Sequence, residues 1–237
     1  MNEKIKKLTR GYTPAKYLTT VAVFAALASG LMFLDFSLPF MPFVSFDFSD
    51  LPALIAAFAL GPIAGVAVEL IKNLFHLLGG STGGVGELAN FIMGCAFVIP
   101  ASLVYRRGNS RKFALIGMAV GAVSMVVTAS VVNYFITIPF FSKVFLPMEA
   151  IIAAYAAIAP AADSLIKVIL IFYVPFNLAK AVILSGITFF AYKSISNLIK
   201  SAGVKKKTET DIIDEAIFED GAQIAKTESG EEGKEDK

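Results

Sequence analysis

The stretch LPALIAAFALGPIAGVAVELIKNLFHLLGG, residues 51–80, decides the fold of this chain. It is almost wholly apolar, and the pair Gly61-Pro62 interrupts it. A helix needs about 20 apolar residues to cross the hydrocarbon core of a bilayer, and a proline within a helix breaks or kinks it. The stretch is therefore either one long pass with a break or a hairpin of two passes. The choice sets the number of passes in the whole chain.

The composition of the chain is that of a membrane protein. Of its 237 residues 56% are hydrophobic and 17% are charged, and the mean hydropathy is +0.70. Soluble domains carry about 25% charged residues, and disordered segments are much less hydrophobic. These values exclude a soluble enzyme, a disordered protein and a fibrous protein. They indicate an integral membrane protein.

Charge decides between the two alternatives for residues 51–80. Three clusters of Lys and Arg lie at residues 4–16, 106–112 and 193–207. Because such clusters stay on the cytoplasmic side, an even number of passes must separate neighbouring clusters. Residues 51–80 are therefore predicted to form a hairpin that turns at Gly61-Pro62. The other passes are predicted at residues 17–34, 87–105, 113–138 and 175–195.

The predicted fold class is all-α, an integral membrane protein with six transmembrane helices and both termini in the cytoplasm. The first outer connection, residues 35–50, is expected to be long and structured. The last outer connection, residues 139–174, is also expected to be long. The chain is expected to divide into three parts: a basic cytoplasmic N-terminus (1–16), a membrane domain (17–200) and a charged cytoplasmic tail (201–237). The composition of the tail is typical of disorder.

Phenylalanine and proline crowd the segment LDFSLPFMPFVSFDFSDLPALI, residues 34–55. Prolines fix the backbone and aromatic rings offer flat apolar faces, which suits a planar aromatic ligand. An interfacial aromatic belt is the alternative, but a belt explains Asp47 and Asp50 poorly.

Polar side chains within apolar helices are costly unless they are used. Asn133 lies near the outer end of the fifth predicted helix, and Asn177 and Lys180 lie one turn apart near the outer end of the sixth. Neither Asn133 nor Lys180 has a partner nearby in the sequence, so both are expected to contact a ligand. Glu69 and Lys72 lie three residues apart and are instead expected to form a structural salt bridge.

The glycine-rich segment GGSTGGVGELANF, residues 79–91, leads into the fourth predicted helix. It is not a Walker A motif, because no Lys-Ser or Lys-Thr follows the last glycine, and a flexible turn is the alternative. Glu87 and Asn90 lie one turn apart at the outer mouth of this helix, where polar side chains are expected to serve a ligand.

Catalytic and metal sites are not expected. The chain has a single cysteine, Cys95, and a single histidine, His76, which excludes a cysteine or histidine metal cluster and leaves a Ser-His-Asp triad dependent on His76. Nucleic acid is not an expected partner, because the positive residues flank hydrophobic segments. An embedded membrane enzyme remains the alternative class.

Ala22, Ala26 and Gly30 form a stripe of small residues on one face of the first predicted helix. In lipid, such stripes let helix backbones approach closely. From the spacing alone, packing within this chain is favoured over docking of a partner.

Four motifs together resemble the riboflavin-specific substrate-binding subunit of energy-coupling factor (ECF) transporters. They are DFSDLPALIAAFALGPIAGVAVELIKN (47–73), GELANF (86–91), NYF (133–135) and PFNLAK (175–180), and the resemblance covers about residues 15–198. The family implies six helices, a vitamin bound near the outer surface, and no ATP hydrolysis by this subunit.

The resemblance implies that Asn133 and Lys180 hydrogen-bond a flavin. Glu87 and Asn90 would form a wall near it, and the segment Phe46-Asp47-Phe48 would cover it. The expected ligand-binding residues are Phe46, Asp47, Phe48, Glu87, Asn90, Asn133, Asn177 and Lys180.

The resemblance also implies partners. It favours docking of the transmembrane coupling subunit on Ala22, Ala26 and Gly30, and two ATP-binding subunits would drive that coupling subunit. Riboflavin is then the transported ligand, and no cofactor is expected. The same fold with another vitamin or a flavin phosphate is the alternative within this class.

Overall fold

The computed structural model describes residues 14–38, 41–80 and 82–201. All of them belong to one compact unit of the chain, Met1–Ala202. Residues 1–13 of the predicted basic N-terminus and residues 202–237 of the predicted tail lie outside the described residues.

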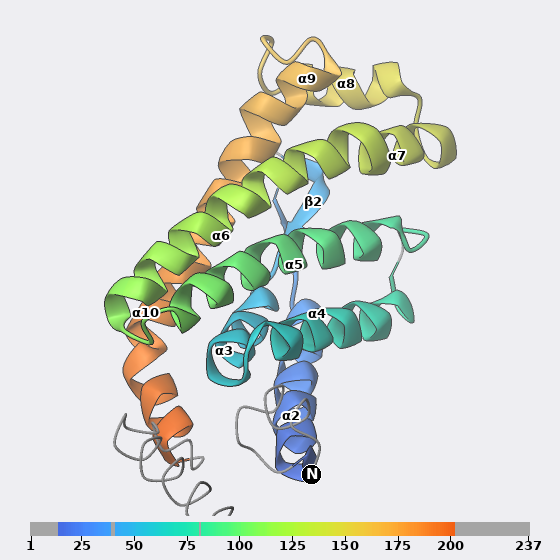
Figure 1. Cartoon of the computed structure of the whole chain (residues 1–237). Coiled ribbons are helices and arrows are strands. Elements are labelled where there is room, and N and C mark those ends of the chain that lie inside the picture. Colours follow the sequence, from blue (N-terminus) through green and yellow to red (C-terminus); the bar gives the residue numbers. More distant parts are fainter. Residues whose placement is uncertain (1–13, 39–40, 81, 202–237) are drawn as a thin grey trace, which may run out of the picture. The chain divides into compact units, whose positions relative to one another are not determined.

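The described chain is mostly helical, with a short antiparallel β-hairpin in the first connection (Figure 1). In that hairpin Phe36 pairs with Phe46 and Ser37 pairs with Ser45. The elements in chain order are α2 (Pro14–Met32), β1 (Phe36–Leu38), β2 (Met41–Phe46), α3 (Asp50–Leu60), α4 (Pro62–Leu77), α5 (Val85–Arg106), α6 (Arg111–Val132), η1 (Asn133–Thr137), α7 (Ile138–Val144), α8 (Met148–Ala156), α9 (Leu165–Val168), η2 (Ile169–Tyr173) and α10 (Val174–Ser201).

Within the described residues, four helical segments are long and apolar enough to cross a membrane. They are Pro14–Met32, Val85–Arg106, Arg111–Val144 and Leu165–Phe190. The shorter helix α3 is also apolar, and most of its side chains are buried.

The break predicted at Gly61-Pro62 is confirmed, because α3 ends at Leu60 and α4 begins at Pro62. Gly61 has a φ of 111°, which glycine adopts without a steric penalty. Pro62 lies in the first turn of α4, where its missing N–H has no intrahelical partner to lose. Helices α3 and α4 pack against each other. The start of α3 contacts α4 near the middle of that helix.

Helices extend into both ends of the predicted outer segment 139–174. The helix that begins as α6 continues through η1 and α7 to Val144, and the last long helix begins at Leu165. The two π-helical turns explain the difference, because each ends two residues before a proline, Pro139 or Pro175. A π turn changes the hydrogen-bond register of a helix, which accommodates a residue that cannot donate. Only residues 145–164 connect the two long helices, and α8 lies within them.

Helices α5 and α6 approach closely, and glycines on α6 allow this (Figure 1). A Cβ atom placed on Gly117 would lie 2.4 Å from the carbonyl oxygen of Ala101, and one on Gly121 would lie 2.6 Å from that of Phe97. Helix α6 also packs against α10, and α2 packs against α4. These contacts fix the helices whose ends surround the site.

Candidate ligand-binding site

A cavity of about 230 Å³ lies among the β-hairpin, α4, the α4–α5 loop, α5, the α6–η1–α7 helix and the η2–α10 helix. Six of the eight expected ligand residues line it: Asp47, Glu87, Asn90, Asn133, Asn177 and Lys180. Phe46 and Phe48 do not line it. Phe46 is buried and packs edge-on against Phe48 and Phe176, so it supports the wall from behind.

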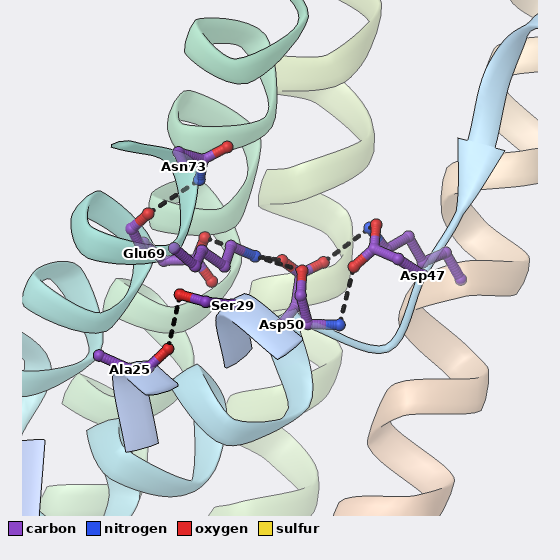
Figure 2. A network of polar contacts seen from close by, with 9 residues as sticks. Ala25, Ser29, Asp47, Asp50, Glu69 and Asn73 are labelled. Carbon is purple, nitrogen blue, oxygen red and sulfur yellow. Dashed lines mark hydrogen bonds and ion pairs between the residues drawn. The ribbon is translucent and has the colours of Figure 1, made fainter. Parts of the chain in front are cut away.

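Lys180 is the only lysine among the described residues that line the cavity, and the carboxylates of Asp47 and Asp50, which Figure 2 labels, hold it there. Its Nζ lies 3.1 Å from Asp47 Oδ2 and 2.9 Å from Asp50 Oδ2. Asp47 is oriented by the backbone N–H of Ser49, which donates to Asp47 Oδ1 at 2.7 Å. Lys180 therefore joins α10 to the turn that leads from the hairpin into α3. Asp50 also lines the cavity, and the sequence argument left it out of the expected site.

Asn133, the first residue of η1, and Asn177, in the first turn of α10, each bond back to a carbonyl four residues earlier. Asn133 Nδ2 donates to the carbonyl of Ala129 at 2.7 Å, and Asn177 Nδ2 donates to the carbonyl of Tyr173 at 2.8 Å. Each amide N–H₂ is thus engaged with its own helix. The Oδ1 atoms are the groups left to accept hydrogen bonds from a ligand.

Two further cavity-lining atoms are buried without a hydrogen-bond partner among the described residues. They are Asn90 Oδ1 on α5 and Thr137 Oγ1 on η1. Leaving such a group unsatisfied costs about 1–3 kcal/mol, so both atoms favour a ligand that can pair with them. The sequence argument missed Thr137, although it follows Asn133 by one turn and could have been found on the same helix face.

Glu87 is anchored rather than free. His76 Nδ1 lies 2.9 Å from Glu87 Oε1, and Thr82 Oγ1 donates to Glu87 Oε2. These contacts join the end of α4, the glycine-rich loop and the first turn of α5. A Cβ atom on Gly80 would lie 2.1 Å from Glu87 Oε1, so the loop passes too close to the carboxylate for a larger residue.

Aromatic side chains from the adjoining ends of the last two long helices complete the cavity. Phe141, Tyr173 and Phe176 line it, and none of them was expected from the sequence. Tyr155 on α8 is fully buried, and its hydroxyl donates to that of Tyr173 at 3.2 Å. Burial raises the pKa of Tyr155, which keeps this hydroxyl protonated as a donor.

The small-residue stripe on α2 does not pack inside the described unit. Ala22, Ala26 and Gly30 are exposed, whereas Ala25 and Ala28 face the other helices. A Cβ atom on Gly30 would have no neighbour within 4 Å.

Within the described residues, no group of three or more His, Cys, Asp and Glu side chains could hold a metal ion.

The model of the family described as "ECF transporter, substrate-specific component" matches residues 16–192. The chain belongs to this family. It is a substrate-specific component (S component) of a transporter and not an enzyme, and it is a multi-pass protein of the cell membrane.

Curated relatives of this S component include two named riboflavin transporters. RibU from Staphylococcus aureus (strain TCH60) is 32% identical over 78% of this chain and 93% of its own length. FmnP from Bacillus subtilis (strain 168) is 34% identical over 72% of this chain and 86% of its own length. A solved structure, titled as the S component of a bacterial ECF transporter, is 31% identical with a TM-score of 0.64. It covers 79% of this chain and 99% of its own length.

Proposed function

We propose that this S component captures riboflavin in the cavity for an ECF-type importer. The observation that carries the proposal is that the polar side chains of Lys180, Asn133 and Asn177 line the same cavity as the aromatic rings of Phe141, Tyr173 and Phe176. The names of the curated relatives support the same ligand.

The chemistry of the wall matches that of riboflavin. Riboflavin has a flat tricyclic ring system, an imide edge with carbonyl acceptors and one N–H donor, and a chain of hydroxyls. Aromatic and aliphatic side chains suit the rings. The Lys180 ammonium can donate to a ring carbonyl, and the Oδ1 atoms of Asn133 and Asn177 can accept from the imide N–H or from hydroxyls.

We propose the following topology for the membrane domain, residues 17–200. It crosses the membrane six times, with α3 and α4 as the second and third passes and with both termini in the cytoplasm. The positive clusters support this orientation. The β-hairpin and the α4–α5 loop then lie on the outer side of the membrane. The cavity therefore opens on the side from which the vitamin arrives.

Docking of the ECF transmembrane coupling subunit is proposed for the stripe of Ala22, Ala26 and Gly30. Its exposure supports this role, because no described residue of the chain covers it. Two ATP-binding subunits would supply the energy through that coupling subunit, and riboflavin is cargo rather than a cofactor. The tail, 201–237, is proposed to stay cytoplasmic.

Titration of the purified chain tests the proposal. Riboflavin fluorescence should be quenched on binding, with a dissociation constant at least a hundredfold below that of thiamine or biotin. FMN is titrated in parallel. Equal or tighter binding of thiamine, biotin or FMN would contradict riboflavin as the ligand. The untreated preparation should also be yellow if flavin copurifies.

A further inference from the structure

Lys72 on α4 lies outside the cavity and is fully buried. Its Nζ donates to Ser49 Oγ at 2.8 Å and forms an ion pair with Asp50 Oδ1. Lys72 and Glu69 also lie within the distance of the expected salt bridge, with Nζ 2.9 Å from Glu69 Oε2. Lys72 thus contacts the same turn, Asp47–Asp50, that holds Lys180.

Asp50 connects the two lysines, one through each carboxylate oxygen. Oδ1 faces Lys72 on α4, and Oδ2 lies 2.9 Å from Lys180 Nζ on α10. Since a carboxylate is planar and rigid, the position of Lys72 sets the direction in which Oδ2 presents itself to Lys180. Lys72 therefore acts on the cavity without touching it.

The charges of this network do not balance if every group is ionised. Lys72 and Lys180 face three carboxylates, Asp47, Asp50 and Glu69, and all five residues are at most 4% exposed. An uncompensated charge buried among membrane helices is strongly unfavourable, and a proton removes it at least cost.

Glu69 is the carboxyl group with the poorest partners. Glu69 Oε1 has no hydrogen-bond partner among the described residues, and Oε2 lies near Lys72 without hydrogen-bond geometry. By contrast, Asp47 and Asp50 each accept from a lysine, and Asp47 also accepts from a backbone N–H. Glu69 also packs against the backbone of Gly94, where a Cβ atom would lie 2.2 Å from Oε2.

We infer that Glu69 carries the proton that neutralises this network, and that Lys72 is a positioning residue which holds Asp50 so that Lys180 presents its ammonium to the ligand. The inference rests on the proposed riboflavin site. Without Lys72, two aspartates share one lysine. The excess negative charge would draw Lys180 away from the ligand.

Four variants test the inference, because they differ in their effect on the net charge of the buried network. Glu69→Gln replaces a protonated carboxyl group by a neutral amide, so its riboflavin affinity should stay within about threefold of the parent. Lys72→Met should bind at least tenfold more weakly. Lys72→Met with Asp50→Asn restores neutrality around Lys180 and should bind at least fivefold more tightly than Lys72→Met. Lys72→Met with Glu69→Gln leaves the excess charge and should bind no better than Lys72→Met.

If Lys72→Met does not fold, the comparison between the two double variants still decides the outcome. Each double variant is measured on monodisperse protein after size exclusion. An infrared band of a protonated carboxyl group should be present in the parent and absent in Glu69→Gln. Parent affinity in Lys72→Met, equal affinity of the two double variants, or a tenfold loss in Glu69→Gln would overturn the inference. If the parent itself binds no riboflavin, the proposed function fails instead.

Discussion

Lys180 Nζ on α10 lies 3.1 Å from Asp47 Oδ2 at the end of the β-hairpin, although 133 residues separate them in the sequence. The contact joins the last long helix to the first connection across the cavity. Both residues are at most 4% exposed, so water does little to weaken the interaction. A ligand that binds Lys180 must share it with this carboxylate.

Lys180→Met should weaken riboflavin binding by at least tenfold. Removing one partner of a buried ion pair leaves the other charge unpaired, which typically costs about 3–5 kcal/mol. Fluorescence titration of the purified protein gives the change in affinity. Lys167→Met is the matched control, because Lys167 is half exposed and its ion-pair partner among the described residues is the exposed Asp163. Similar affinities in the two variants would remove Lys180 from the site.

Asn133→Ala and Asn90→Ala should each weaken riboflavin binding by at least about 1.5 kcal/mol, since each removes a ligand acceptor from a buried wall. Ser130→Ala is the control, because the Ser130 hydroxyl donates to the carbonyl of Val126 on its own helix and Ser130 is not among the residues that line the cavity. The same titration measures all three. Parent affinity in both asparagine variants, with folding intact, would reject this wall as the flavin site.

Gly117→Ala should lower the thermal unfolding midpoint in detergent. The added methyl group would meet the Ala101 carbonyl at 2.4 Å and force α5 and α6 apart, at a cost of about 1–3 kcal/mol. Gly186→Ala on α10 has no neighbour within 4 Å of the new atom and should be neutral or slightly stabilising. Equal midpoints for the two variants would mean that the α5–α6 approach is not tight.

Ala22→Trp should separate ligand binding from assembly. Because Ala22 is exposed, the large side chain should leave folding and riboflavin affinity unchanged while it blocks close approach of another helix. Recovery of the chain with the coupling subunit, and uptake by cells, should both fall. Loss of riboflavin binding together with assembly would indicate that the stripe serves packing within the chain.

Cys95→Ala should bind riboflavin like the parent protein. Cys95 lies on α5 but does not line the cavity, so its thiol is expected to serve packing only. A tenfold change in the dissociation constant would show that Cys95 shapes the site.

The sequence predicted the break between α3 and α4 because Gly61-Pro62 is a local signal. It also predicted Lys180 and Asn133 as ligand-contacting residues. An isolated polar residue within an apolar helix stands out in the sequence even when its partners lie far along the chain. The partners themselves could not be found in this way. Lys180 pairs with Asp47 and Asp50, and Glu87 pairs with His76, only after distant segments pack together.

The last two long helices reach beyond the predicted spans 113–138 and 175–195 for a related reason. Proline near an apolar segment usually marks a helix end, and these spans stop just before Pro139 and start at Pro175. The π turns Asn133–Thr137 and Ile169–Tyr173 let the helices continue, but a π turn has no sequence signature as clear as Gly-Pro.

The π turn Ile169–Tyr173 makes the site depend on the number of residues in a helix and not only on their kind. Each residue of an α-helix turns the following chain by about 100°, so deletion of one residue from this turn would rotate everything after it by that amount. Asn177 and Lys180 would then leave the cavity wall, while the helix would stay as apolar as before. Insertion or loss of a single apolar residue here is therefore a route by which a chain of this fold could gain or lose its ligand without any change to a polar side chain.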